Sequence, residues 1–468
     1  MNQFTAPACS RRTSQQTLVI FAMSAQLLGG CATFSKDGGF NTVTQITQDR
    51  TGKAVKAIRS DDDAASVQSS IKALLAKPLD AGDAVQIALL NNRGLQATYA
   101  ELGIAEADLV LAGRLHNPGF TFRRTRQGDD VLIERTFTMN LISLITAPLA
   151  QKIEGRRFEQ VKLLVANEAL HVAAETRRAY FDAIAGGQGV DYAKQVNLAA
   201  EAGADLAHQM GRSGNWSALE QAREQAFYAE ATAGVARAMK ASVIAREKLT
   251  RLMGLWGDDI HFQLPERLPE LPAQPLELDN AESMALQNRL DIQAGKLETA
   301  GLASSLGLTK TTRFVNVLDL GYIRNNQTGL PPERGYELSI EIPLFDWGGA
   351  RVTKAESIYM QSVNRLAETA VNARSEVRES YLGYRTSYDL ARHYRDNIVP
   401  LRKKISDENL LRYNGMLISV FELLADARDQ IASVNGYIDA LKDYWIAETD
   451  LQAALGGKLP NNNSTKGQ

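Results

Sequence analysis

The chain is poor in the residues and motifs that most enzymes need. It has 468 residues but only two cysteines, Cys9 and Cys31, and five histidines, none at a metal-ligand spacing from another. GxGxxG, P-loop and GxSxG motifs are also missing. We therefore expect no enzymatic activity, no metal and no cofactor. Two cysteines also exclude a disulfide framework.

An excess of one charge and long apolar runs are likewise absent. Lys and Arg number 52 against 54 Asp and Glu, for a formal net charge of −2, which argues against a nucleic-acid partner. Beyond the N-terminal region, no run of 18 apolar residues predicts a transmembrane helix. Proline is scarce, with 13 residues, so long uninterrupted helices are possible.

The N-terminal region has the pattern of a secretory signal. Arg11 and Arg12 precede a short apolar run, and small residues come just before Cys31. This arrangement resembles a bacterial lipobox, which predicts cleavage before Cys31, lipidation of that residue (with palmitate among its acyl chains) and an outer-membrane address, because Ala32 rather than Asp follows. The alternative is an ordinary signal peptide with a chance cysteine.

The two halves of the chain repeat each other at an offset of about 200 residues. The corresponding segments are Ala88–Asn91 and Ala285–Asn288, Pro148–Arg156 and Pro343–Arg351, Tyr180 and Tyr381, and Ser217–Gly254 and Ser419–Gly456. We expect a duplicated architecture in which each half is helix, strand, loop, strand, long helix, turn and helix.

The segments predicted from this pattern cover the whole chain. They are a lipoprotein signal peptide (1–30), an extended, lipid-anchored tether (31–79), a first repeat (80–257) with a β-hairpin at about 119–147, a Pro-rich, non-helical linker (258–279), a second repeat (280–457) with a hairpin at about 313–344, and a disordered tail (458–468).

Four short segments alternate apolar and polar residues with the period of two that is typical of strands. Aromatic and aliphatic residues such as Phe137, Met139 and Tyr336 form one face. The opposite face carries the carboxylates Glu134, Asp319, Glu337 and Glu341. The pattern fits either a sheet resting on a helix or strands of a membrane β-barrel, apolar outside and with these four carboxylates facing the lumen.

Four strands are too few to close a membrane barrel around water. Three chains of four strands each would supply twelve, which predicts a homotrimer that shares one barrel. The predicted long helices hold about 60 residues and cannot fold into a compact ball, so they need lateral partners as in a coiled coil.

Several motifs resemble those of the TolC-type outer-membrane factor family, in particular its lipoprotein members. They are the PLFDWGGxR segment Pro343–Arg351, the paired ALxN segments, and Ala454–Gly457. The resemblance covers roughly residues 80–457. It implies a mainly α-helical fold with a small membrane β-barrel part, in which the trimeric twelve-stranded barrel continues into a periplasmic α-helical barrel. It also implies a passive export conduit of a tripartite efflux or type I secretion system, with a periplasmic adaptor and an inner-membrane transporter as partners.

The resemblance also suggests where function resides. Two turns would form the periplasmic tips that dock the adaptor, at Gly211, Gly214, Asn215, Asn414, Gly415 and Met416. Glu422 matches the first carboxylate of the family's pore constriction, but the second would fall at Ala425. Asp426, next to Ala425, is the other candidate, although it points about 100° away from the Ala425 position on a helix. Glu422 could instead, or also, complete a capping box with Ser419.

A non-conducting structural lipoprotein, acting as a periplasmic helical spacer or adaptor, is the competing hypothesis. The alternating strands favour the conduit, because a spacer has no need of apolar strand faces with aromatic residues.

Overall fold

The computed structural model describes residues 33–315 and 317–457, which fall into two units. Unit 1 comprises the described part of Met1–Gly39 with Leu102–Val161 and Gly295–Arg365. Unit 2 comprises Phe40–Glu101, Lys162–Ala294 and the described part of Leu366–Gln468. The predicted signal peptide, the lipidation site Cys31 and the predicted tail lie outside the described residues.

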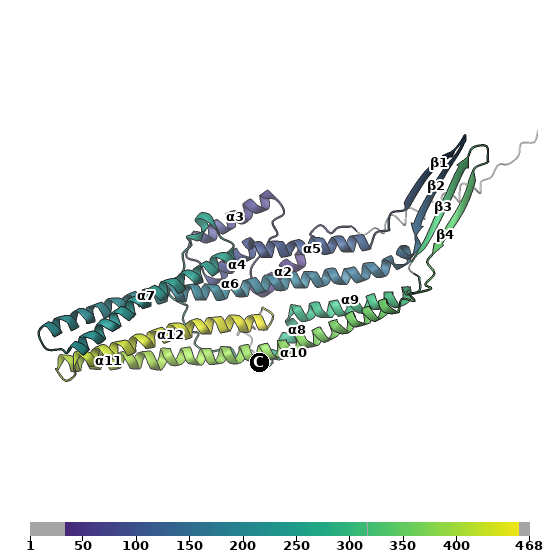
Figure 1. The fold of residues 1–468 in the computed structure, drawn as a ribbon. Coiled ribbons are helices and arrows are strands. Elements are labelled where there is room, and N and C mark those ends of the chain that lie inside the picture. The colour runs from purple at the N-terminus through teal and green to yellow at the C-terminus, as the bar shows by residue number, and fades with distance from the viewer. Residues whose placement is uncertain (1–32, 316, 458–468) are drawn as a thin grey trace, which may run out of the picture. The chain divides into compact units, whose positions relative to one another are not determined.

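The order of elements repeats, as the sequence predicts (Figure 1). The first copy contains α4 (Ala81–Asn91), α5 (Arg93–Ala112), β1 (Gly119–Gln127), β2 (Asp130–Asn140), α6 (Leu141–Arg212) and α7 (Ala218–Met253). The second contains α8 (Ala281–Asn288), α9 (Leu290–Thr312), β3 (Leu318–Gln327), β4 (Glu333–Ile340), α10 (Gly349–His393), η2 (Tyr394–Ile398), α11 (Val399–Asn414) and α12 (Val420–Ala454). The prediction of a duplicated, mainly helical fold with one small sheet is confirmed.

The segment predicted to be an extended tether contains two helices, α2 (Phe40–Thr51) and α3 (Asp61–Leu75), so that prediction was wrong over these residues. Its polar composition hid a narrow apolar stripe, because α3 buries Val67 and Ile71 at helical spacing. The side chain of Ser60 accepts a hydrogen bond from the Asp63 backbone and caps α3.

Each repeat begins with two helices where we predicted one. The first copy breaks at Asn92, whose side chain caps α5 by accepting from the Leu95 backbone at 3.0 Å. Just before it, Asn91 Nδ2 donates to the Gly254 carbonyl at 2.7 Å, so the break is tied to the end of α7. The second copy breaks at Arg289, and there the preceding Asn288 backbone lies against Gly456. The ALxN segments are therefore breaks that pack on the glycines ending α7 and α12.

The long helices continue through prolines. The strand β2 ends at Asn140, whose side chain accepts from the Ser143 backbone at 2.7 Å at the start of α6. Pro148 therefore lies inside α6, whereas we predicted that the first hairpin continues to about residue 147. Pro400 follows the π-helical turn η2, which separates α10 from α11. A π-turn supplies the looser hydrogen bonding that a proline in a helix requires.

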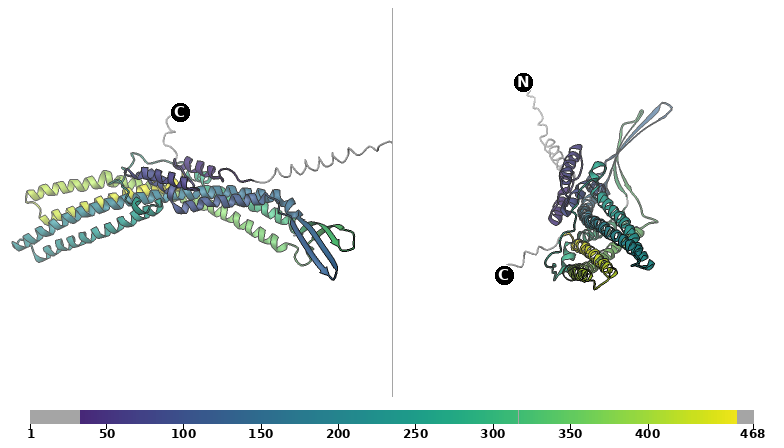
Figure 2. Two further views of the ribbon diagram at one scale, coloured as in Figure 1. Left: turned by 90° about the horizontal axis from the view of Figure 1, so that it is seen from above. Right: turned by 90° about the vertical axis from the view of Figure 1, so that its left-hand side faces the viewer.

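The four strands form one antiparallel sheet in the order β1-β2-β3-β4 (Figures 1 and 2). The hairpins turn at Gly128 and Gly329, both with left-handed backbone. β2 pairs with β3, which joins the hairpins of the two repeats within unit 1. The outer strands β1 and β4 each pair on one side only within the described residues.

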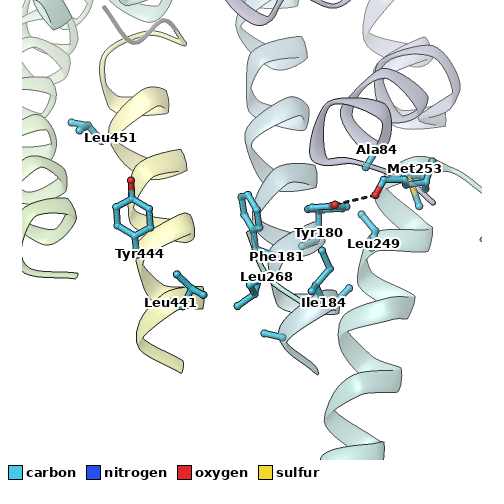
Figure 3. Packing of buried hydrophobic residues seen from close by; sticks show 14 of the residues in the cluster. Ala84, Tyr180, Phe181, Ile184, Leu249, Met253, Leu268, Leu441, Tyr444 and Leu451 are labelled. Atoms are coloured by element: carbon cyan, nitrogen blue, oxygen red, sulfur yellow. Dashed lines mark hydrogen bonds between the residues drawn. The ribbon is translucent and has the colours of Figure 1, made fainter. Parts of the chain in front are cut away.

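The core of unit 2 consists of side chains from helices of both repeats. Tyr180 and Ile184 of α6 pack with Leu249 and Met253 of α7, all less than 4% exposed (Figure 3). The Tyr180 hydroxyl donates to the Leu79 carbonyl at 2.9 Å, which satisfies its one polar group. Burial of each such side chain contributes about 1.5–3 kcal/mol.

Aromatic side chains hold the Pro-rich linker against the helices α10 and α12 of unit 2. Its residues form neither helix nor strand after η1 (Gly257–Ile260), as we predicted. Tyr388 donates to the Ala273 carbonyl at 2.9 Å, and Trp445 donates to the Pro269 carbonyl at 3.0 Å. The Tyr384 hydroxyl accepts from the Leu276 backbone at 2.8 Å. The linker therefore ties α10 and α12 together in an extended conformation.

Candidate functional site

The strand register separates the sheet into two chemically different faces. One face carries aromatic and aliphatic side chains, and we call it the apolar face. Phe120 lies opposite Phe137, and Tyr322 lies opposite Tyr336, with ring centroids 6.5 Å and 5.7 Å apart. These side chains are exposed; that of Tyr336 is 83% exposed. An exposed apolar sheet face of this kind needs an apolar environment.

The other face, which we call the polar face, collects the predicted lumen carboxylates. Glu134, Asp319 and Glu337 share it, because each side chain points away from the apolar face in the observed register. Arg123 Nη1 lies 3.3 Å from Glu134 Oε2, and Asn140 Nδ2 donates to Asp319 Oδ1 at 2.8 Å. Glu341 comes after the end of β4, so its side chain has no strand register.

The PLFDWGGxR motif forms the joint between β4 and α10. Gly348 is left-handed, and a Cβ there would lie 2.6 Å from the Arg313 carbonyl oxygen, so only glycine fits. Asp346 Oδ1 accepts from the Gly348 backbone at 2.8 Å, and Arg351 donates to the Arg313 carbonyl at 3.1 Å. Phe345, fully exposed, and Trp347, 63% exposed, extend the apolar surface beyond the strand.

The two predicted tip turns lie at the same end of unit 2 (Figure 1). They have the same backbone hydrogen bond, from Asn215 to Met210 at 2.9 Å in one and from Leu417 to Arg412 at 2.8 Å in the other. This is the six-residue bond of a Schellman motif, which needs one left-handed residue.

That left-handed residue is Gly214 in the first turn and Met416 in the second, with φ of 57° for Met416. Met416 is the one non-glycine residue with positive φ among the described residues, and its side chain is 93% exposed. A left-handed L-residue costs about 1–2 kcal/mol. Strain held at an exposed apolar side chain marks a candidate contact site.

Glu422 completes a capping box at the start of α12. Its side chain accepts from the Ser419 backbone at 3.2 Å, while its own backbone donates to the Ser419 hydroxyl at 3.3 Å. Ser217 and Glu220 form the same capping box at α7. Glu422 is nevertheless exposed, so its second carboxylate oxygen can face solvent.

Asp426, the other candidate for the pore constriction, is buried in the packing of this chain. It is only 8% exposed, and its Oδ2 atom is buried without a hydrogen bond among the described residues.

An ion pair near the tips, which the sequence did not indicate, joins the two repeats. Arg428 Nη2 of α12 donates to both carboxylate oxygens of Glu224 of α7, at 2.7 and 2.8 Å. Glu224 is 1% exposed, and the Arg428 guanidinium lies 4.2 Å from the centre of the Phe227 ring. In the sequence both residues look like ordinary charges on helix surfaces, and only the packing of α7 on α12 shows that they meet.

A pocket of about 560 Å³ lies within unit 2, lined by α6, α10 and α12. Its arginines have internal partners: Arg178 pairs with Asp450, Arg289 with Asp291 and Glu376, and Arg177 with Gln452. Burial lowers the pKa of Arg177 and raises that of the neighbouring Glu448. These groups bind each other, so the pocket offers no unpaired arginine to a ligand.

Over the described ranges, no group of three or more His, Cys, Asp or Glu side chains is arranged to hold a metal ion. In the same ranges, no helix combines the length and apolarity needed to cross a bilayer.

No protein-family model matches the chain, and no curated protein matches it in sequence. Solved structures do. The Campylobacter jejuni CmeC outer membrane channel superimposes with a TM-score of 0.67 at 17% identity, over 82% of this chain and 86% of CmeC. The outer-membrane channel OprN gives 0.68 at 16% identity, over 88% and 95%. The Neisseria gonorrhoeae MtrE outer membrane channel, in its open state, gives 0.66 at 17% identity, over 80% and 89%. This chain therefore has the fold of the outer-membrane channels CmeC, OprN and MtrE.

Proposed function

We propose that the protein is the outer-membrane channel of a tripartite efflux or type I secretion system and conducts its cargo passively. The observation that carries this proposal is the sheet of unit 1, which has an exposed apolar face and a polar face with carboxylates. Its two outer strands, β1 and β4, each have one edge without a partner strand within the described residues. In lipid, unpaired backbone groups cost several kcal/mol each, so the edges need partners.

An assembly of three chains would give each of these strand edges a partner. If β4 of one chain pairs with β1 of the next, twelve strands close into a barrel whose apolar faces meet lipid and whose carboxylates line water. Glu134, Asp319 and Glu337 would then give the lumen a negative charge. A homotrimer is therefore part of the proposal, and the fold of CmeC, OprN and MtrE supports it.

Lipidation of Cys31 would attach the chain to the same membrane. Ser35, the fourth residue after Cys31, is hydrogen-bonded through its backbone and hydroxyl to Glu106 Oε1, at 2.6 and 2.5 Å. Glu106 belongs to unit 1 and is 5% exposed. The lipid anchor would thus be attached to the unit that carries the sheet.

The tips of unit 2 would face the periplasm and dock an adaptor, which connects them to an inner-membrane transporter that supplies the energy. The exposed Met416 and Leu417, 93% and 76% exposed, support this role. A ring of Glu422 carboxylates, one from each chain, would narrow the pore and favour cations.

Planar-bilayer recording of the purified full-length protein tests the channel, and heat-resistant trimers in detergent test the assembly. Cation-preferring conductance from trimers is expected. A protein that inserts as a monomer, or that forms trimers without conductance, would instead fit the non-conducting spacer. Lipidation is tested separately, by the mass of the mature N-terminal peptide in wild type and Cys31→Ser.

A further inference from the structure

Three arginines lie side by side on the apolar face of the sheet. The register pairs Arg135 of β2 with Arg324 of β3, and Arg324 with Arg334 of β4. We call these three residues the arginine row. Like charges directly opposite each other in a sheet are destabilising. The chain therefore maintains an unfavourable arrangement that an external anion would relieve.

The arginine row has little compensation within the described chain. Arg135 Nη1 donates to Asn326 Oδ1 at 3.1 Å, which is a neutral partner. Arg324 and Arg334 are exposed and form no ion pair with another described residue. Two further arginines, Arg124 and Arg126, lie beyond the row on the same face. Within the four described strands, this face carries five arginines and no carboxylate.

The polar face has the opposite balance. It carries Arg123 together with five carboxylates, which are Asp130, Glu134, Asp319, Glu333 and Glu337. Arg123 is paired with Glu134. Acid and base are thus separated across the thickness of the sheet, and the unpaired positive charge is on the face that would meet lipid.

The position of the row along the strands matches the layering of a lipid leaflet. From the helix ends toward the turns, the apolar face passes through aliphatic, aromatic and arginine levels, each separated by two residues, or about 7 Å. The levels are Leu318 and Ile340; Met139, Leu320 and Leu338; Phe120, Phe137, Tyr322 and Tyr336; and then Phe122 with the arginine row. Lipid tails, the interface where aromatic residues gather, and charged headgroups follow one another in the same order.

We propose that the arginine row binds the phosphate groups of anionic lipid headgroups in the leaflet that surrounds the hairpin turns. Guanidinium groups bind phosphate bidentately and suit this position better than lysine would. The phosphates neutralise the row, and the aromatic level below contacts the same lipids. This inference rests on the proposed membrane function, and it adds a lipid class and a site to it.

Purified full-length protein in detergent, titrated with diphosphorylated lipid A, tests the proposal, with phosphatidylcholine and inorganic phosphate as separate arms. Native mass spectrometry measures the lipid retained, and the thermal midpoint measures its effect. Wild type should bind lipid A and gain stability from it, with little effect of the other two. The single variant Arg324→Gln should bind lipid A at least about tenfold more weakly than wild type. The same holds for the triple variant that combines Arg324→Gln with Arg135→Gln and Arg334→Gln.

Thermal stability without lipid is a second test, in which the variant is expected to change in the opposite direction. Without lipid A, Arg324→Gln should be at least as stable as wild type, because the change removes repulsion within the row. The matched control is Arg123→Gln, on the other face of the same sheet, which should bind lipid A like wild type. Equal lipid A binding by wild type and the triple variant overturns the proposal. So does a gain in the thermal midpoint of wild type that is as large with inorganic phosphate as with lipid A. Conductance of the same samples is recorded in parallel, so a wild type that binds lipid A but does not conduct contradicts the channel and leaves the lipid site standing.

Discussion

Arg428 and Glu224 form a two-point ion pair across the repeats, with Nη2 of the arginine 2.7 and 2.8 Å from the two carboxylate oxygens. Arg428 follows Glu422 by six residues on α12, and Glu224 follows Glu220 by four residues on α7. The pair therefore fixes the capped ends of two helices, one from each repeat, against each other. Because Glu224 is almost fully covered, the pair depends on the closed packing of these helices.

Removal of the Glu224 charge should destabilise unit 2 strongly. Glu224→Ala leaves the partly buried Arg428 guanidinium without its carboxylate, and breaking such a pair costs on the order of 3 kcal/mol. Glu230→Ala is the matched control, because Glu230 pairs with Arg237 on the same helix but both side chains are about two-thirds exposed; its cost should be below about 1 kcal/mol. Thermal denaturation followed by circular dichroism compares the two, and equal shifts would contradict the buried pair.

Gly254 should tolerate a methyl group much less than Gly257 does. Both are left-handed, with φ of 65° and 63°. A Cβ on Gly254 would lie 2.7 Å from the Asn91 carbonyl oxygen, whereas a Cβ on Gly257 meets nothing within 4 Å. Gly257→Ala should therefore cost only the backbone strain of about 1–2 kcal/mol, and Gly254→Ala clearly more. Chemical denaturation measures both, and similar costs would show that the α4–α5 break does not depend on this close approach.

The repeats, the strands and the motif-bearing joint could be predicted because each depends on local pattern. Alternation gave the apolar and polar faces, and the left-handed Gly348 explains why the joint motif contains glycine. The alignment of Arg135, Arg324 and Arg334 was not predicted, because alternation assigns each of them to a face but only the strand register brings them to one level.

The predictions of helix boundaries failed where tertiary contacts determine the local structure. The single helix expected at the start of each repeat breaks because Asn91 hydrogen-bonds to the end of α7, and nothing in residues 80–112 alone indicates that contact. The helices α2 and α3 were missed because only two residues of each are buried, and the polar residues around them hide the helical spacing in the sequence.

Met416→Gly should stabilise the second tip turn and weaken docking. Glycine accepts φ of 57° without strain, so the gain should be about 1 kcal/mol. Loss of a side chain that is 93% exposed costs no internal packing. If the tip binds an adaptor, the same variant should show weaker cross-linking to it in cells. Gly214→Ala is the complementary control, because a Cβ there meets nothing within 4 Å and its cost should be strain alone. A destabilised Met416→Gly variant would mean that the methionine packs on the turn.

Stability should depend on pH through Glu448. Burial raises the pKa of this carboxyl above its ordinary value, despite the attraction of Arg177. The folded protein then binds the proton more tightly than the unfolded chain does. The contribution to stability is present below the unfolded pKa of about 4.3 and is lost as the pH rises through the raised folded pKa. Glu448→Gln should flatten this dependence and be the more stable protein at pH 7. Thermal midpoints between pH 4 and 7 test it, with the exposed Glu201→Gln as control; an unchanged slope would exclude Glu448 as its source.

Glu422→Gln can separate the two roles of this residue. A glutamine can still accept from the Ser419 backbone, because capping boxes use either Glu or Gln, so the thermal midpoint should change little. The charge is lost, however, and cation preference in planar bilayers should fall if three Glu422 side chains surround the pore. Glu220→Gln makes the same change in the capping box of the first repeat, where no pore role is proposed, and should leave selectivity unaltered. Lowered stability with unaltered selectivity in Glu422→Gln would assign the residue to its helix alone. Lowered selectivity in both variants would mean that both tips line the pore, because charge at either turn would then act on the same ions.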